Sequence, residues 1–121
     1  MNLFLSFPGN AAEAMDFYLS VLTGAVGSEP VYYPDSNQIL NVQMTFKGQT
    51  IMMMDVEDSP SFTWSASLYV ETDSEAEFQT LLKGLGDGGT VLMGPEPAGI
   101  MALAAWVTDR FGLTWQLVWR G

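Results

Sequence analysis

This 121-residue chain contains few side chains of the types that commonly act in catalysis, and the missing types exclude several classes of reaction. The chain has no His and no Cys, so it lacks the commonest general base near neutral pH, a thiol nucleophile and the usual ligands of Zn²⁺. General-base catalysis would therefore require a carboxylate with a raised pKa, and the two candidates are Glu71 and Asp55. Nothing in the sequence indicates such a shift, so the chain is not expected to be an enzyme.

One neutral side chain, Gln116, interrupts the apolar segment TWQLVW at residues 114–119. Because side chains alternate across a strand, Gln116 is expected on the opposite face from Trp115 and Leu117. Two interpretations stay open. Gln116 orients a small ligand in a cavity, or it satisfies a backbone group or a buried water.

The same alternation predicts that polar and Met side chains from several strands share the inner face of a sheet. This predicted ligand-binding set is Asn41, Gln43, Met52, Met54, Ser67, Tyr69 and Gln116. Apolar walls with a few neutral polar groups suit a small, uncharged or weakly polar organic ligand. The alternatives are that Asn41 and Gln43 face water, that the Met residues only fill the core, and that Tyr69 is a structural aromatic residue.

Asp109 and Arg110 together suggest a catalytic acid beside an anion-binding group. They lie in the turn-like segment TDRFG, where an Asp side chain commonly hydrogen-bonds its own backbone. We therefore predict a structural turn. The acidic segments DVED and ETDSEAE are likewise interpreted as solvated turns and as a helix N-terminus, where negative charge is favourable.

The elements that must position these residues follow the same order in both halves of the chain. The first half predicts a strand at 2–7, a helix at 11–22, and strands near 27–33, 39–46 and 50–56. The second half predicts a strand at 64–72, a helix at 74–85, and strands at 90–93, 100–108 and 113–119. Asn10, with Glu13 three residues later, is expected to cap the first helix, and Asp73 the second.

Short matches between the halves indicate a duplication. Gly48-Gln49-Thr50 precedes Gly112-Leu113-Thr114 by 64 positions (112 − 48 = 64). The predicted fold class is α+β, with two tandem βαβββ modules at residues 1–60 and 61–121 of a single domain.

Five segments spread along almost the whole chain carry a family resemblance: LSFPGNAAEAMDFYLSVLTGAV, GQTIMMMD, SLYVETDSEAEFQTLL, GGTVLM and VTDRFGLTWQL. In this order they resemble the vicinal-oxygen-chelate superfamily of glyoxalases and bleomycin-resistance proteins, and more closely its PhnB-like (3-demethylubiquinone 3-methyltransferase-like) branch. The resemblance implies a curved, open half-barrel sheet with helices outside, usually completed in a homodimer. The segment PAGIMALAAW departs from the aromatic FWG-like stretch common in that branch.

The resemblance also implies where a metal ion would bind. Metal-dependent members hold a divalent ion with four side chains, which carry over to Leu3, Met52, Ser67 and Gln116. None of these is a carboxylate or an imidazole, so hard cations and Zn²⁺ lack suitable ligands. We expect no metal and no other cofactor; for an adenosyl cofactor in particular, a glycine-rich strand-to-helix turn is missing.

Charge and hydropathy restrict the partners. The formal net charge is −10, which disfavours nucleic acid and anionic membranes. No signal peptide or membrane-spanning run is visible, so a cytoplasmic location is expected. Only 15% of the residues are charged, so some apolar surface is expected to contact a second copy of the chain in a homodimer. The favoured function is metal-free binding of a small molecule. The alternatives are a metal-dependent lyase, isomerase or dioxygenase, and an orphan dimeric scaffold.

Overall fold

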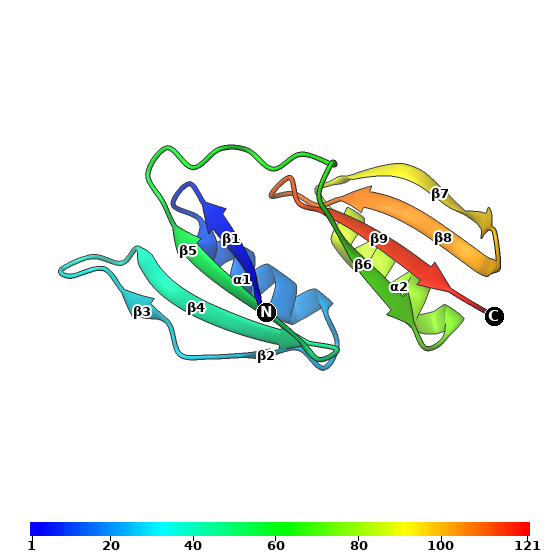
Figure 1. The fold of residues 1–121 in the computed structure, drawn as a ribbon, viewed down its shortest axis with the longest axis horizontal. Helices are drawn as coiled ribbons and strands as arrows, with labels where there is room; N and C mark the ends of the chain where they lie inside the picture. The colour runs from blue at the N-terminus through cyan, green and yellow to red at the C-terminus, as the bar shows by residue number, and fades with distance from the viewer. The chain divides into compact units, whose positions relative to one another are not determined.

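Two α-helices and nine β-strands are divided between two units of the chain, Met1–Pro60 and Ser61–Gly121. The computed structural model describes all residues from 1 to 121. Each unit contains one helix and one mixed sheet, which gives the predicted α+β fold class (Figure 1). Neither helix is long and apolar enough to cross a membrane.

The first unit contains β1 (Leu3–Phe7), α1 (Ala11–Val21), β2 (Val26–Gly27), β3 (Val31–Tyr32), β4 (Ile39–Phe46) and β5 (Gln49–Asp55). Its sheet has the order β1-β5-β4-β2, and β3 also pairs with β4. β1 runs parallel to β5, and the other pairs are antiparallel. The single strand expected near 27–33 is wrong. Pro30 lies between β2 and β3, and because proline has no N–H to donate to a sheet, the segment is split into two short strands.

The second unit contains β6 (Ser67–Thr72), α2 (Glu75–Gly86), β7 (Thr90–Ala98), β8 (Met101–Thr108) and β9 (Thr114–Trp119). Its sheet has the order β6-β9-β8-β7, with β6 parallel to β9. β7 is longer than the predicted strand at 90–93. It continues past Gly94 to Ala98, and its register with β8 is irregular between Met93 and Glu96, where β7 has one residue more than β8.

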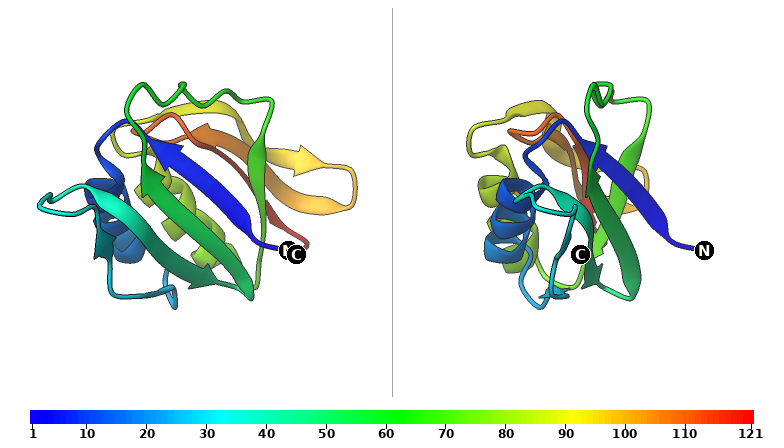
Figure 2. Two further views of the ribbon diagram at one scale, coloured as in Figure 1. Left: turned by 60° about the vertical axis from the view of Figure 1, so that its left-hand side comes forward. Right: turned by 90° about the vertical axis from the view of Figure 1, so that its left-hand side faces the viewer.

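Each helix covers one face of its own sheet, and the core of each unit lies between them (Figure 2). In the first unit, α1 buries Ala11, Ala14, Met15 and Tyr18. In the second unit, α2 buries Phe78, Leu81 and Leu85. Strand residues that face the helices are buried at every second position, among them Val42, Met44, Phe46, Ile51, Met53, Trp115 and Leu117.

One residue of β4 does not follow the predicted alternation. Strict alternation with Val42 would put Leu40 on the helix side, but Leu40 is 37% exposed and Ile39 is buried instead. The register between β3 and β4 is irregular here, with Asn41 opposite Val31 and Ile39 opposite Tyr32. This irregularity shifts the alternation at the start of β4.

The N-terminus of α1 is held by a residue distant in the sequence. Asn10 occupies the N-cap position, but its side chain makes no capping hydrogen bond, so the predicted capping box is wrong. The carboxylate of Asp55 replaces it by accepting hydrogen bonds from the backbone N–H of Ala11 at 2.9 Å and of Ile39 at 2.8 Å. Asp55 is 4% exposed, so the expectation that the DVED segment is entirely solvated is also wrong.

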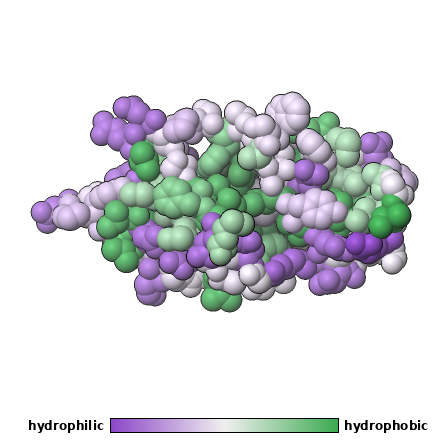
Figure 3. All heavy atoms as spheres, in the orientation of Figure 1, coloured by the Kyte–Doolittle hydropathy of each residue, from purple (hydrophilic) through white to green (hydrophobic).

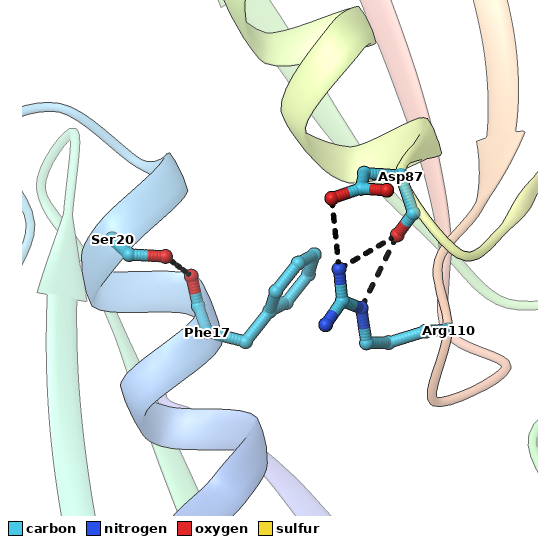
Figure 4. Close-up of polar contacts among 4 residues, drawn as sticks. All are labelled: Phe17, Ser20, Asp87 and Arg110. Atoms are coloured by element: carbon cyan, nitrogen blue, oxygen red, sulfur yellow. Dashed lines mark hydrogen bonds and ion pairs between the residues drawn. The ribbon is translucent and has the colours of Figure 1, made fainter.

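The two ends of α2 are capped differently, by a local contact at the N-terminus and by a residue 23 positions away at the C-terminus. Ser74, not Asp73, is the N-cap, and its hydroxyl accepts a hydrogen bond from the N–H of Glu77 at 3.0 Å. At the other end, Arg110 donates to the backbone carbonyl of Asp87 and pairs with its carboxylate at 3.1 Å (Figure 4).

Figure 4 also shows a contact inside α1, where the Ser20 hydroxyl donates to the Phe17 carbonyl at 2.7 Å.

The repeated glycines occupy equivalent turns. Gly48, with φ of +81°, lies between β4 and β5, and Gly112, with φ of +89°, lies between β8 and β9. Positive φ is a conformation that glycine adopts without steric cost. The two turns therefore impose the same local demand on the sequence, which explains the Gly-X-Thr match between the two halves.

Candidate functional site

A row of three side chains crosses the second sheet on the face turned away from α2, which we call the helix-free face of that sheet. Gln116 on β9 is the register partner of Tyr69 on β6 and of Trp106 on β8. Residues that are register partners project to the same side of a sheet. The amide of Gln116 is therefore flanked by two aromatic side chains, of which Tyr69 is 57% exposed.

A hydrogen bond fixes the Gln116 side chain. Its Nε2 donates to the hydroxyl oxygen of Ser67 at 2.7 Å. This leaves the amide oxygen of Gln116 without a protein donor. Two of the predicted ligand residues, Ser67 and Gln116, are thus brought together, with Tyr69 beside them. The orientation that the bond imposes turns Gln116 into a positioned acceptor.

Trp106 belongs to this row and Trp64 lies beside it, and sequence reasoning missed both as site residues. The rings of Trp64 and Trp106 have centroids 6.1 Å apart and are inclined by 51°. Trp64 is 65% exposed, an unusual state for so large an apolar side chain. Strand alternation would have identified Trp106. Thr108 pairs with Thr114, which is two residues from Gln116, and Trp106 is two residues from Thr108, so all four side chains lie on the same face.

The next row gives the face an apolar floor that ends in an ion pair. Val118 and Ala104 are register partners, and each is 5% exposed. Glu71, opposite Val118, accepts a hydrogen bond from Nε of Arg120. That hydrogen bond and the charge of Glu71 raise the pKa of Arg120 above its usual value. Glu71 is thus a partner of a cation and not an isolated carboxylate available as a general base.

The remaining predicted residues belong to the first unit. Met52 and Met54 alternate with buried residues of β5 and are partly exposed, so they lie on the face of the first sheet turned away from α1. Met52 is the register partner of Gln43 on β4 and of Phe4 on β1. Asn41 lies two residues before Gln43. Figure 3 shows hydrophobic residues gathered over the strands of this unit.

The resemblance implies that Leu3 shares a metal site with Met52, and the pairing of β1 with β5 contradicts this position. Leu3 pairs with Ile51, which is 3% exposed on the helix side, whereas Phe4 pairs with Met52. In the second unit, Tyr69 pairs with Gln116. Phe4 and Tyr69 therefore occupy equivalent positions in β1 and β6, 65 residues apart (69 − 4 = 65). By the same offset, the residue equivalent to Ser67 is Asn2. A shift of one residue moves a side chain to the other face.

The two buried carboxylates of the chain have structural roles. Asp109 accepts hydrogen bonds from the N–H of Phe111 at 2.8 Å, the N–H of Leu113 at 3.1 Å and the indole of Trp115 at 2.9 Å. The predicted structural turn is confirmed. Asp55, considered above as a general base, is engaged by two backbone N–H groups on the helix side of its sheet.

The side chains at the metal-ligand positions do not fit a divalent ion. Leu3 has no donor atom and faces the helix, Met52 offers a thioether, and the Ser67 hydroxyl is engaged by Gln116. No group of three or more acidic, His or Cys side chains is arranged to hold a metal. Without a carboxylate, nothing in this set offsets the cost of dehydrating a dication.

The strand-to-helix turns do not fit an adenosyl cofactor either. Such cofactors use a glycine-rich turn and the free N–H groups of a helix N-terminus. The turn before α1 has one glycine, Gly9, and the N–H of Ala11 is bonded to Asp55. The turn before α2 has none, and Ser74 occupies the N–H of Glu77.

Comparison with known proteins gives matches over nearly the whole chain. The family model described as 3-demethylubiquinone-9 3-methyltransferase matches residues 1–118. The PhnB protein from Bacillus cereus is 29% identical, with a TM-score of 0.88 and coverage of 98% of both chains. Protein PA1353 from Pseudomonas aeruginosa is 26% identical, with a TM-score of 0.87, covering 99% of this chain and 96% of that one.

More distant structures share the fold alone. The fosfomycin resistance protein FosX from Mesorhizobium loti is 13% identical, with a TM-score of 0.69, covering 98% of this chain and 88% of that one. Among curated proteins, the comparison found no match.

Proposed function

The chain belongs to the 3-demethylubiquinone-9 3-methyltransferase family in its PhnB-like, vicinal-oxygen-chelate form, and on that basis we propose that it binds a small organic molecule without a metal ion. The observation that carries the proposal is the fixed amide of Gln116. Its oxygen is an acceptor held by Ser67 between the side chains of Tyr69 and Trp106. Apolar surface with a few oriented polar groups is the usual composition of a small-molecule site.

The row on the second sheet defines what the ligand must offer. A flat, largely apolar group would pack against Trp106 and Tyr69, and an N–H or O–H donor would reach the Gln116 oxygen. The Tyr69 hydroxyl supplies a second neutral polar group. Because neither Gln116 nor Ser67 is charged, a neutral ligand loses less solvation here than an ion does.

The helix-free face of the first sheet supplies a second set of proposed contacts. Met52 and Met54 present adaptable thioethers, and Asn41 and Gln43 present amides. These groups repeat the combination of apolar surface and neutral hydrogen-bonding groups found on the second sheet. They suit the same class of ligand.

The proposal predicts how single substitutions change ligand-induced stabilisation. In a thermal-shift panel of small neutral aromatic and heteroaromatic compounds, we expect some to raise the Tm of the wild-type protein. Gln116→Ala should reduce that shift, since it deletes a positioned acceptor worth about 1 kcal/mol, or about fivefold in affinity. Tyr69→Phe and Asn41→Ala should each reduce it.

Gln79→Ala is the matched control, because Gln79 is an exposed amide on α2 and should leave every shift unchanged. If all three site variants keep the wild-type shift, the assigned contacts are wrong. Metal content separates the proposal from a metal-dependent lyase, isomerase or dioxygenase. Stoichiometric Mn²⁺, Ni²⁺ or Zn²⁺ that is lost in Gln116→Ala would favour the enzyme.

The proposed assembly is a homodimer. In the first unit, Phe4, Val26 and Val31 are between 52% and 68% exposed, although each is a large apolar side chain. Apolar surface of this kind is typical of interfaces between chains. A monomer in light scattering at micromolar concentration would contradict this assembly.

A further inference from the structure

A pocket of about 530 Å³ lies in the first unit, and none of its lining residues belongs to the ligand-binding set proposed above. It is bordered by the turn between β1 and α1, by the segment between β3 and β4, and by the end of β5. The lining residues that matter here are Gly9, Tyr33, Ser36, Gln38, Asp55 and Glu57. Its volume suits a small organic molecule.

The lining carries negative charge without a cation. Asp55 is 4% exposed, and no Lys or Arg forms a salt bridge with it, because its oxygens are bonded only to backbone N–H groups. Glu57 is exposed and has no hydrogen-bond or ion-pair partner. The first unit contains seven Asp and Glu residues but only one basic residue, Lys47. The pocket therefore lies in a negative field.

The remaining lining groups are mainly acceptors and an aromatic ring. The Gly9 carbonyl has only a long contact, at 3.5 Å, with the Gln38 amide. The Ser36 oxygen accepts from the N–H of Gln38 at 2.9 Å and retains a second lone pair. The Tyr33 hydroxyl donates to the backbone oxygen of Asp55 at 2.8 Å, which holds the ring in the wall. Beside Gly9, the buried side-chain oxygen of Asn10 has no donor.

We propose that this pocket binds a small organic cation, a primary ammonium group attached to an apolar body. The ammonium group brings three N–H donors to a site rich in acceptors, and its charge is attracted by Glu57 and Asp55. The apolar body, or the cation itself, packs on the Tyr33 ring. A metal ion fits less well, since both carboxylate oxygens of Asp55 are already hydrogen-bonded.

The test uses benzylamine, which is cationic at neutral pH, and benzyl alcohol as a neutral compound of nearly the same shape. Binding is followed at low salt by amide chemical shifts in the full-length protein. We expect benzylamine to saturate the shifts of Gly9, Ser36 and Gln38, and benzyl alcohol to bind at least about tenfold more weakly. Glu57→Gln should weaken benzylamine binding by about fivefold, because it removes one charge at the pocket.

Asp58→Asn is the matched control. It removes one carboxylate from the neighbouring position, does not line the pocket, and keeps a residue type that tolerates the φ of +59° found there. It should change benzylamine binding less than twofold, and Gln116→Ala should not change it. The proposal is overturned if benzylamine produces no saturable shift at these residues or if benzyl alcohol binds equally well. It is also overturned if Glu57→Gln has no larger effect than Asp58→Asn.

Discussion

Replacing Asp109 with Ala is expected to lower the free energy of unfolding by about 3 to 5 kcal/mol, because it removes the acceptor shared by three N–H donors. The donors are the backbone N–H groups of Phe111 and Leu113 and the indole of Trp115, and the carboxylate that they share is 3% exposed. Urea denaturation followed by circular dichroism and tryptophan fluorescence measures the loss.

Asp109→Asn and Asp16→Ala are the two comparison variants, a conservative substitution and a surface control. The Asn variant keeps one oxygen acceptor and should lose about half as much stability. Asp16 is an exposed residue of α1, so its replacement by Ala should change the free energy of unfolding by less than about 0.5 kcal/mol. A loss below about 1 kcal/mol for Asp109→Ala would show that these hydrogen bonds do not hold the turn.

Gly94→Ala is expected to destabilise the second unit by about 3 kcal/mol or more, because β7 and β8 must separate to admit a methyl group. A Cβ at this position would lie 2.2 Å from the carbonyl oxygen of Ala104 and 3.1 Å from the Cα of Ala105. Both are backbone atoms of β8, so no side chain can rotate away. Thermal or urea denaturation of the purified variant measures the effect.

Gly48→Ala is a closely matched control. Gly48 has the same φ of +81° as Gly94, but a Cβ there meets nothing within 4 Å. It should therefore cost only the strain of a positive φ, about 1 kcal/mol. The difference between the two variants isolates the clash in the second sheet. Equal losses would show that the clash with β8 contributes nothing.

Much of the fold could be predicted because local patterns and long-range packing agree. In β5, Ile51 and Met53 are buried and Met52 is not, as strict alternation requires. The strand at 39–46 was predicted with its observed bounds. The Gly-X-Thr repeats mark equivalent turns because Gly48 and Gly112 both need positive φ.

The candidate site was predicted only in part, because the register between two paired strands cannot be read from the sequence of either strand alone. Side-chain alternation put Met52 on the helix-free face, as observed, but the family resemblance put Leu3 on the same face, whereas Leu3 pairs with the helix-facing Ile51. Parallel pairing of β1 with β5 depends on a contact between distant segments. A local pattern cannot reveal a shift of one residue.

By itself, the sequence determined the alternation of side chains and the repeated glycine turns, and its lack of His and Cys excluded imidazole and thiol groups from any site. Only the tertiary structure decided which groups meet. It placed Trp106 beside Gln116, engaged Asp55 with the N-terminus of α1, and paired Glu71 with Arg120. Local propensity sets the elements, whereas hydrogen bonds between residues more than 40 positions apart, such as Ala11 to Asp55, are set by packing.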